Sequence, residues 1–390
     1  MILLQVIFWV SLFLIFYSYL LFPVLLQWMA RNKKISEDLF KPDEYPNLSV
    51  LISAFNEETV IEEKINSLLK SDYPANRMEI LVGSDASTDR TNQILKQLGE
   101  LHSIVHVHLF EKRKGKPGVI NELAGYSKGE VLVITDANVM VDRNTLSQVA
   151  RHFKSEKTGL VDTRMINTRL KKDGISHQEK YYISREVKIK QHESQLWGSM
   201  MGPFGGCYAV RKSLYKPVPD NFLVDDFYIN MAVLKQGFQC ISNVEAQVFE
   251  DVSNNLKEEF RRKKRISAGN FQNLAEFGSL LFSPYPGVSF CFFSHKVIRW
   301  IVPFLVLLTL TLSIYLSSWH LIYLVLALLQ VTVIALPLID HFLRKIKIHS
   351  LPLRFISHFV LMNLALLAGF IKYIGGIKHN VWQPTSRIQD

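Results

Sequence analysis

The sequence predicts an α/β domain inserted between two apolar ends, and three observations support this fold class. Residues 47–273 alternate between short β-rich runs and segments of helical periodicity, as a layered α/β domain does. Residues 2–29 are almost wholly apolar, and residues 298–376 hold two clear apolar runs and a weaker third. The chain has 390 residues, which is enough for one sizeable globular domain and a separate membrane part.

The N-terminal segment, residues 1–30, is predicted to be a transmembrane helix because its apolar run reaches the length that crosses a bilayer. The basic run 31–34 follows at once, so the positive-inside rule keeps the following domain on the cytoplasmic side. A cleaved signal peptide would carry its basic residues before the apolar run. Three scattered cysteines without close spacing favour a reducing cytosolic setting.

The central domain, residues 47–275, is predicted to resemble one mononucleotide-binding half of a doubly wound sheet. Strands are expected at residues 48–53, 79–83, 104–110 and 130–135, with helical patterns between them. In such sheets, ligands gather at the carboxyl ends of the strands. The polar residues that follow each predicted strand are therefore the candidates for a binding site.

The C-terminal part begins with an aromatic and apolar stretch, residues 276–297, which is expected to form an interfacial helix. Residues 298–376 form a membrane region, and residues 377–390 form a tail. A third full span would place Lys378, His379 and Arg387 outside, against the positive-inside rule. The number of spans therefore stays open between two and three, and so does the side of the C-terminus.

The charge of the chain points to anionic partners. Lys and Arg number 45 against 35 Asp and Glu, a formal charge of +10, which suits nucleic acid, anionic lipid or an anionic small substrate. The basic runs 31–34, 261–265 and 344–347 each lie near an apolar stretch, which favours membrane lipids. No interleaved aromatic and basic pattern suits a single-stranded nucleic acid, so no nucleic-acid partner is expected.

The first two strand ends carry candidate nucleotide ligands. Asn56 and Glu57 follow the first strand, where they cap a helix start and face the ligand crevice. Asp85 ends the second strand, where its carboxylate could accept a hydrogen bond from a uracil ring or a ribose hydroxyl. The alternative is a capping box formed by the acids of residues 85–89, and both interpretations can hold together.

A basic loop with glycines, residues 112–118, precedes the next helix and contains Lys116. Cationic charge and exposed backbone N–H groups suit a diphosphate. A solvated basic loop is the alternative.

Asp136 and Asn138 follow the fourth strand and place two oxygen donors two residues apart. Mg²⁺ or Mn²⁺ accepts such ligands and keeps substrate phosphates in its shell. The alternative is an Asp-x-Asn turn without metal.

Asp225 and Asp226 begin a later helix, and one acid can cap that helix while the other accepts a proton. The neighbouring carboxylate raises the pKa of such a base, and simple capping of the helix is the alternative. The basic run 261–265 includes Arg265 and could close over a diphosphate or bind lipid headgroups.

This ordered set resembles the family 2 inverting glycosyltransferases, in particular the membrane-integrated branch with cellulose, chitin, hyaluronan and poly-N-acetylglucosamine synthases. The resemblance spans residues 50–272 and implies a GT-A-type Rossmann-like nucleotide-sugar domain. Its motifs place donor binding at Asn56, Glu57, Asp85, Lys116, Asn121 and Arg265, metal binding at Asp136 and Asn138, the acceptor side at Gly205, Gly206, Arg211 and Asp225, and the catalytic base at Asp226.

The sequence departs from the family pattern at three places. Asn138 replaces the usual second acid of Asp-x-Asp, which removes one negative charge from the metal site. Residues 224–226 read Val-Asp-Asp in place of Thr-Glu-Asp. The Gln-x-x-Arg-Trp motif of processive synthases keeps only its arginine, Arg265, and Ile266 replaces the tryptophan. The loss of this tryptophan weakens the case for long-chain polymerisation.

The resemblance implies a membrane enzyme that moves a sugar from a UDP-sugar to a carbohydrate or lipid-linked acceptor at the cytoplasmic face, with Mg²⁺ or Mn²⁺ as cofactor. Polysaccharide synthesis is one interpretation, and addition of a single sugar to a lipid carrier or glycolipid is the first alternative. A membrane-tethered nucleotide-sugar-binding protein without turnover is the second. With few spans, a self-contained channel is questionable, so a homo-oligomer or a partner subunit is a further hypothesis.

Overall fold

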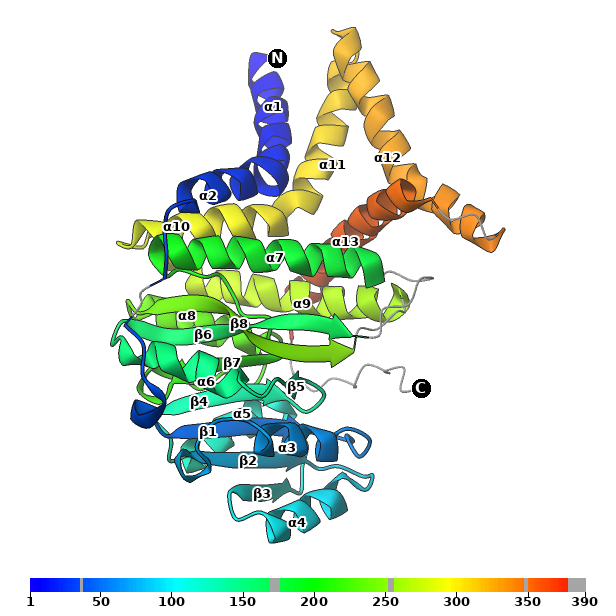
Figure 1. Cartoon of the computed structure of the whole chain (residues 1–390). Helices are drawn as coiled ribbons and strands as arrows, with labels where there is room; N and C mark the ends of the chain where they lie inside the picture. The colour runs from blue at the N-terminus through cyan, green and yellow to red at the C-terminus, as the bar shows by residue number, and fades with distance from the viewer. Residues whose placement is uncertain (36–37, 169–175, 252–255, 347–349, 378–390) are drawn as a thin grey trace.

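A computed structural model describes residues 1–35, 38–168, 176–251, 256–346 and 350–377 (Figure 1). Within these residues the chain forms a mixed sheet of eight strands in the order β3-β2-β1-β4-β7-β6-β8-β5. The strands are β1 (Leu48–Ala54), β2 (Met78–Asp85), β3 (Val105–Phe110), β4 (Val131–Asp136), β5 (Met140–Val141), β6 (Thr158–Thr168), β7 (Cys207–Arg211) and β8 (Gln239–Asp251). The α/β fold class that the sequence predicts is confirmed.

Strands β1 to β4 run parallel to one another, and the four strands predicted from the sequence correspond to them within about two residues. Their continuous apolar runs bury side chains on both faces: Val50 and Ile52 enter one core, and Leu51 enters the other. The covering helices are α3 (Ile61–Leu69), α4 (Thr91–Leu101), α5 (Gly115–Tyr126) and α6 (Thr145–Ala150). Helix α5 packs on the face opposite to the other three.

Strand β7 reverses the direction of the sheet between β4 and β6. It pairs antiparallel with both neighbours, and its register sets Cys207 opposite Thr135 and Arg211 opposite Val131. The loop that precedes β7 therefore meets the carboxyl end of β4, where the backbone N–H of Asp136 donates to Gly206 O at 2.9 Å. The end of β7 lies at the opposite edge of the sheet.

A layer of helices separates the sheet from the apolar helices. Figure 1 shows α7 and α9 running across the molecule in this layer. The helices here are α7 (Ser176–Trp197), α8 (Asp225–Lys235) and α9 (Leu256–Phe277). Because α8 begins at Asp225, both acids of the predicted base motif lie in its first turn.

The helices of the apolar ends are α1 (Ile2–Phe16), α2 (Phe22–Ala30), α10 (Pro286–Cys291), α11 (Ile298–Leu316), α12 (Leu321–Lys345) and α13 (Leu351–Ile374). Figure 1 shows α1, α11 and α12 extending away from the sheet. Four described segments are long and apolar enough to cross a membrane: Ile2–Ala30, Pro286–Leu316, Leu321–Leu343 and Leu351–Ile374. Length and composition thus indicate a membrane protein.

Two π-helical turns, Tyr17–Leu21 and Phe292–Val297, change the direction of these helices. Figure 1 shows α2 and α10 running across the molecule, whereas α1 and α11 point away from it. The turns meet where the Tyr17 hydroxyl lies 2.9 Å from Ser294 Oγ. The segment expected to be interfacial, residues 276–297, thus includes α10 and leads without a break into α11.

The last apolar helix, α13, packs on α9 and is not isolated. Ser267 Oγ donates to Leu366 O at 2.7 Å, and the rings of Phe271 and Phe370 lie 4.8 Å apart. The predicted tail, residues 377–390, lies outside the described residues from 378 onward. The three cysteines, Cys207, Cys240 and Cys291, are all buried as free thiols.

Candidate active site at the carboxyl ends of the strands

Asp85 ends β2 and fixes the loop that leads into α5. Its oxygens accept hydrogen bonds from Arg113 Nε at 2.9 Å, from Lys114 N at 2.6 Å and from Gly115 N at 3.0 Å. The Arg113 guanidinium also lies 3.3 Å from the centroid of the Phe55 ring, just after β1. Asp85 is only 2% exposed, so its carboxylate shapes the diphosphate loop that the sequence predicts.

Asn56 joins the loops that follow β1 and β2. Its backbone has φ of 53°, a left-handed conformation that asparagine tolerates better than most residues. Its side-chain Oδ1 accepts a hydrogen bond from Thr88 N at 2.8 Å. The next backbone N–H, that of Glu57, donates to Thr91 Oγ1 at 2.9 Å. Both predicted nucleotide residues therefore lie at the same edge of the sheet as Asp85.

Lys116 lies between carboxylates that come from two different elements. It lies in the first turn of α5, and its Nζ is 2.6 Å from Asp136 Oδ1 and 3.6 Å from Asp225 Oδ2. The same ammonium donates to Gly205 O at 3.4 Å. Burial opposes the charge on Lys116, but Asp136 and Asp225 outweigh it and raise the pKa of the ammonium. One lysine thus joins β4, α8 and the loop before β7.

Asp226 has the properties of a proton acceptor. Burial, together with the neighbouring charge of Asp225, raises the pKa of its carboxyl to about 6, although Lys116 acts in the opposite direction. Gly205 faces it with φ of 82°, and a Cβ atom at this position would lie 2.5 Å from Asp226 Oδ2. The predicted acceptor loop therefore contacts the predicted base directly, and only glycine fits there.

The two candidate metal ligands follow β4. Asp136 is held by Lys116, and Asn138 donates its Nδ2 hydrogen to Glu250 Oε1 at 3.0 Å. Sequence reasoning missed Glu250, which lies near the end of β8; the acids that close this strand resemble the pattern at the end of β4. Among the described residues, no group of three or more His, Cys, Asp and Glu side chains forms a candidate metal cluster.

Arg265 reaches the same place from α9. Its Nη1 donates to Leu223 O at 2.7 Å, just before the acids of α8. Burial and the neighbouring Arg262 lower the pKa of this guanidinium, whereas the carboxylates of Asp225 and Asp226 favour its charge. Because Leu223 lies two residues before Asp225, this hydrogen bond sets Arg265 beside the start of α8.

Two predicted site residues serve other contacts. Asn121 holds segment 215–218: its Oδ1 accepts hydrogen bonds from a tyrosine hydroxyl at 2.7 Å and a backbone N–H at 3.0 Å. Arg211 donates to backbone oxygens within segment 153–158 at 2.9 to 3.3 Å. Because Arg211 ends β7, it lies at the edge of the sheet away from Asp136. The structure does not bring Arg211 to the acceptor loop.

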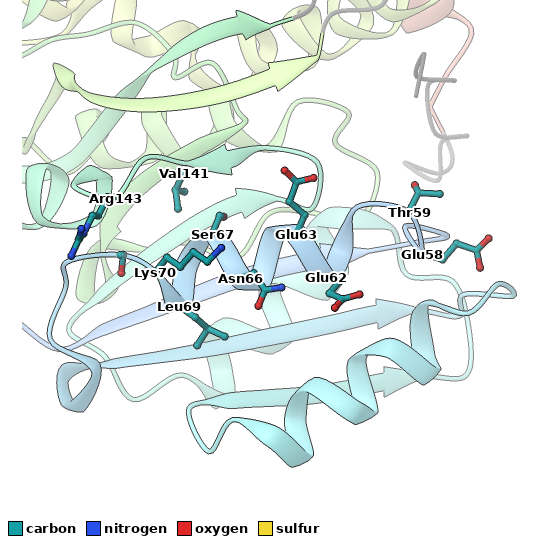
Figure 2. Close-up of a pocket in the computed structure, with 11 residues that line it drawn as sticks. Glu58, Thr59, Glu62, Glu63, Asn66, Ser67, Leu69, Lys70, Val141 and Arg143 are labelled. Atoms are coloured by element: carbon teal, nitrogen blue, oxygen red, sulfur yellow. The ribbon is translucent and has the colours of Figure 1, made fainter. Parts of the chain in front are cut away.

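A surface pocket lies beside α3, as Figure 2 shows. Its lining includes Glu58, Glu62, Glu63 and Arg143, and none of the predicted site residues belongs to it. The predicted site residues at the strand ends therefore lie outside this pocket.

Lys116, Asp136 and the loop before β7 lie in a part of the chain that matches a known protein family. Residues 49–218 match the model of the family described as glycosyl transferase family 2. This part of the chain belongs to glycosyltransferase family 2. The match contains the predicted donor and metal residues except Arg265, and it contains the loop before β7.

Similar proteins include two curated enzymes. The probable glycosyltransferase YdaM of Bacillus subtilis is 25% identical over 282 residues, 67% of this chain and 66% of that protein. The beta-monoglucosyldiacylglycerol synthase of Nostoc is 28% identical over 155 residues, 39% of this chain and 33% of that protein. The match thus spans a third to just under two thirds of these relatives.

A solved structure shows the same fold. The mannosyltransferase PcManGT of Pyrobaculum calidifontis, in complex with GDP-Man and Mn²⁺, superposes with a TM-score of 0.69 at 19% identity. The superposition covers 94% of this chain and 99% of that one. The sheet therefore belongs to the GT-A type, flanked by apolar helices on both sides in the sequence.

Proposed function

We propose that this protein is an inverting glycosyltransferase that moves a sugar from a UDP-sugar to a carbohydrate or lipid-linked acceptor at the cytoplasmic face of a membrane. The observation that carries the proposal is the contact of Lys116 with acids from two elements, Asp136 of β4 and Asp225 of α8. Family membership adds the reaction class, and the apolar helices add the membrane.

Asp226 is the base of the proposed reaction. The acceptor oxygen attacks the anomeric carbon, the bond from that carbon to the diphosphate oxygen breaks, and Asp226 takes the hydroxyl proton. A carboxyl whose pKa is about 6 is mostly ionised at neutral pH, yet it binds a proton more readily than an ordinary aspartate. Its position beside Gly205 puts it at the proposed acceptor side.

The leaving diphosphate carries negative charge, and cations from two elements would bind it. Lys116 lies at the start of α5, where backbone N–H groups favour an anion, and Arg265 approaches from α9. Asp225 helps to hold Lys116 between the two sides of the crevice. These contacts would orient the diphosphate and stabilise its charge.

The residues after β4 fit a divalent metal of the Mg²⁺ or Mn²⁺ type. Asp136 offers a carboxylate, and Glu250 holds the amide nitrogen of Asn138, which leaves the amide oxygen as the donor atom. When bound, such an ion would neutralise charge on the departing diphosphate. The solved mannosyltransferase structure was obtained with Mn²⁺, which supports this choice.

The acceptor is proposed to be lipid-linked, with one sugar added for each binding event. Ile266 stands beside Arg265 where processive synthases have tryptophan, and a relative in Nostoc is described as a beta-monoglucosyldiacylglycerol synthase. The helix that carries Arg265 packs against α13, so the site and the apolar region share one element. Membrane lipids are therefore the proposed surroundings of the acceptor.

The test is a screen of nucleotide sugars with purified protein in lipid nanodiscs, with and without Mn²⁺ or Mg²⁺. The expected result is metal-dependent release of UDP from one UDP-sugar when membrane lipid extract is supplied, with one organic-soluble labelled product. High-molecular-weight product would overturn single addition and leave the transferase proposal in place. Absence of nucleoside diphosphate release from every donor and acceptor would favour a binding protein without turnover.

A further inference from the structure

A buried ion cluster lies between α7 and the helix that leads into the membrane. We define it as Glu186 and Glu193 of α7 with His295, Lys296 and Arg299. The side chain of His295 is 0% exposed, and its Nδ1 is 2.7 Å from Glu193 Oε1 while its Nε2 is 2.9 Å from Glu186 Oε2. Arg299 and Lys296 also pair with Glu186. The cluster therefore joins the catalytic domain to the apolar helices through charge.

The ring of His295 bridges the two glutamates of α7. Each of its nitrogens lies within hydrogen-bond distance of a carboxylate oxygen. Such a buried arrangement costs desolvation energy, and removal of one partner leaves the others unpaired. Apolar contacts alone could hold the helix without this desolvation cost, but they would not select a single position for it. The cluster thus specifies one position of the helix on α7.

Helix α7 also holds the loop before β7, residues 200–206. The second oxygen of Glu193 accepts the Met201 backbone N–H at 3.0 Å. Three residues earlier on α7, Lys190 pairs with Asp162 Oδ2 at 2.8 Å, and Asp162 Oδ1 accepts the Phe204 N–H at 3.4 Å. The loop is therefore held from α7 at two separate amides.

The same loop contacts three residues of the proposed site. Gly205 faces Asp226 so closely that a Cβ atom would lie 2.5 Å from Oδ2. Gly205 O accepts from Lys116, and Gly206 O accepts from the backbone of Asp136. A shift of this loop by less than an ångström would change all three contacts.

We propose that His295 and Glu193 are positioning residues: the seating of the π-helical turn Phe292–Val297 on α7 sets the loop 200–206 and thereby the place of Asp226. The membrane-side helix then contributes to catalysis without contacting substrate. The link from His295 to the loop is independent of the proposed function, whereas the effect on turnover rests on it.

The first test measures hydrogen–deuterium exchange of segment 198–206 in the full chain in nanodiscs, without substrate. In His295→Leu, Glu193 loses the ring that holds its Oε1 oxygen, so its Oε2 oxygen no longer stays fixed on the Met201 amide. We expect the Met201 amide to exchange about tenfold faster, as for loss of one buried hydrogen bond. Glu193→Ala should do the same. Glu193→Gln retains an oxygen for Met201 and should keep most of the protection.

The matched control is Ser18→Ala. It removes the hydrogen bond from Ser18 Oγ to Ser294 O at 3.2 Å, next to His295, but leaves the contacts of His295 with Glu186 and Glu193 on α7 in place. Its segment 198–206 should exchange at the rate of the unchanged protein. Equal exchange of this segment in His295→Leu and Ser18→Ala, with both proteins folded, would overturn the link.

The second test uses the donor found in the screen. His295→Leu should lower turnover about 10-fold to 100-fold while the affinity for UDP, measured by calorimetry, changes less than about threefold. Faster exchange with unchanged turnover would overturn the positioning role. If the unchanged protein releases no UDP, the proposed function fails, and the exchange measurement still decides whether His295 controls the loop.

Discussion

Carboxylate oxygens are hydrogen-bonded to different extents in two places. One is the buried ion cluster, and the other is the crevice with Asp136, Asp225 and Asp226. In the cluster, the carboxylates of Glu186 and Glu193 accept from His295, Arg299 and backbone. In the crevice, Asp225 Oδ2 is buried without a hydrogen bond, and its nearest named cation, Lys116, stays 3.6 Å away. Every carboxylate oxygen of Glu186 and Glu193 thus has a hydrogen-bond partner within the protein, whereas Asp225 Oδ2 has none.

The two places differ in whether the protein satisfies its own buried carboxylate oxygens. A buried carboxylate oxygen without a hydrogen bond costs stability, and proteins retain such groups where a ligand or a reaction uses them. The raised pKa of Asp226 belongs to the same pattern. Glutamates whose oxygens are all hydrogen-bonded therefore fit a scaffold, and a crevice with an unbonded carboxylate oxygen fits the proposed site. The following predictions test this division, beginning with the largest effect.

Asp226→Asn should reduce turnover by at least about 1000-fold, because the amide cannot accept the acceptor proton. Binding of UDP, measured by calorimetry, should change less than about threefold because the shape is kept. Turnover within tenfold of the unchanged protein would remove Asp226 from the role of base.

Gly205→Ala should lower turnover about 100-fold, because the new Cβ collides with Asp226 and the positive φ is strained. Initial rates of UDP release measure this. The control is Gly125→Ala on α5, where a Cβ meets nothing within 4 Å. If both variants behave alike, the contact between the loop and the base has no catalytic importance.

Glu250→Ala should weaken Mn²⁺ binding about tenfold in the presence of UDP, because the Asn138 amide then loses the hydrogen bond that orients it. Electron paramagnetic resonance of free Mn²⁺ gives the dissociation constant without any turnover. Glu245→Ala, an exposed position on the same strand, is the control. Equal constants for the two variants would contradict the orienting role.

The pKa of Asp226 also predicts how stability depends on pH. Because the folded carboxyl binds its proton more tightly than the unfolded one, its contribution to stability is full below the unfolded pKa and is lost as pH rises through about 6. Asp226→Asn mimics the protonated form. It should therefore gain about 1 kcal/mol relative to the unchanged protein at pH 8, a value reduced for partial exposure, and close to nothing at about pH 3, below the unfolded pKa. Thermal unfolding at both pH values measures this, and an equal difference at both would contradict it.

Arg211→Ala should have the smallest effect on catalysis. Its guanidinium binds backbone oxygens at the far edge of the sheet, so the variant should lose stability by about 2 kcal/mol but keep turnover within about threefold. Activity per folded molecule, with folded protein quantified by gel filtration, is the measurement. A selective rise in the KM for the acceptor would instead place Arg211 at the acceptor side.

Much of the fold was predictable from the sequence because β1 to β4 are apolar runs that end in polar residues. Parallel strands bring those ends to one edge, so Asp85 and Asp136 were expected together. Arg211 was not predictable in this way. Strand β7 runs antiparallel, and five residues of strand carry the chain roughly 16 Å to the opposite edge.

The partners from distant segments were also beyond sequence reasoning. Glu250 and Asn138 are 112 positions apart, and His295 and Glu193 are 102 positions apart. Neither pair forms a spaced motif, because each depends on how β8 or the π-helical turn Phe292–Val297 packs in three dimensions. Similarly, His295 lies within an apolar stretch, where charge pairing cannot be read without the partner helix.

The burial of Cys207, Cys240 and Cys291 has a practical consequence for orientation. A thiol reagent that cannot cross lipid should find little native reactivity on the folded protein, since desolvation also raises the pKa of the Cys207 and Cys240 thiols. Single cysteines introduced at the α11–α12 turn and on exposed α4 could then be labelled in intact cells or inverted vesicles. Because the native cysteines should not react, the introduced cysteines alone would report which side of the membrane each end of the fold occupies.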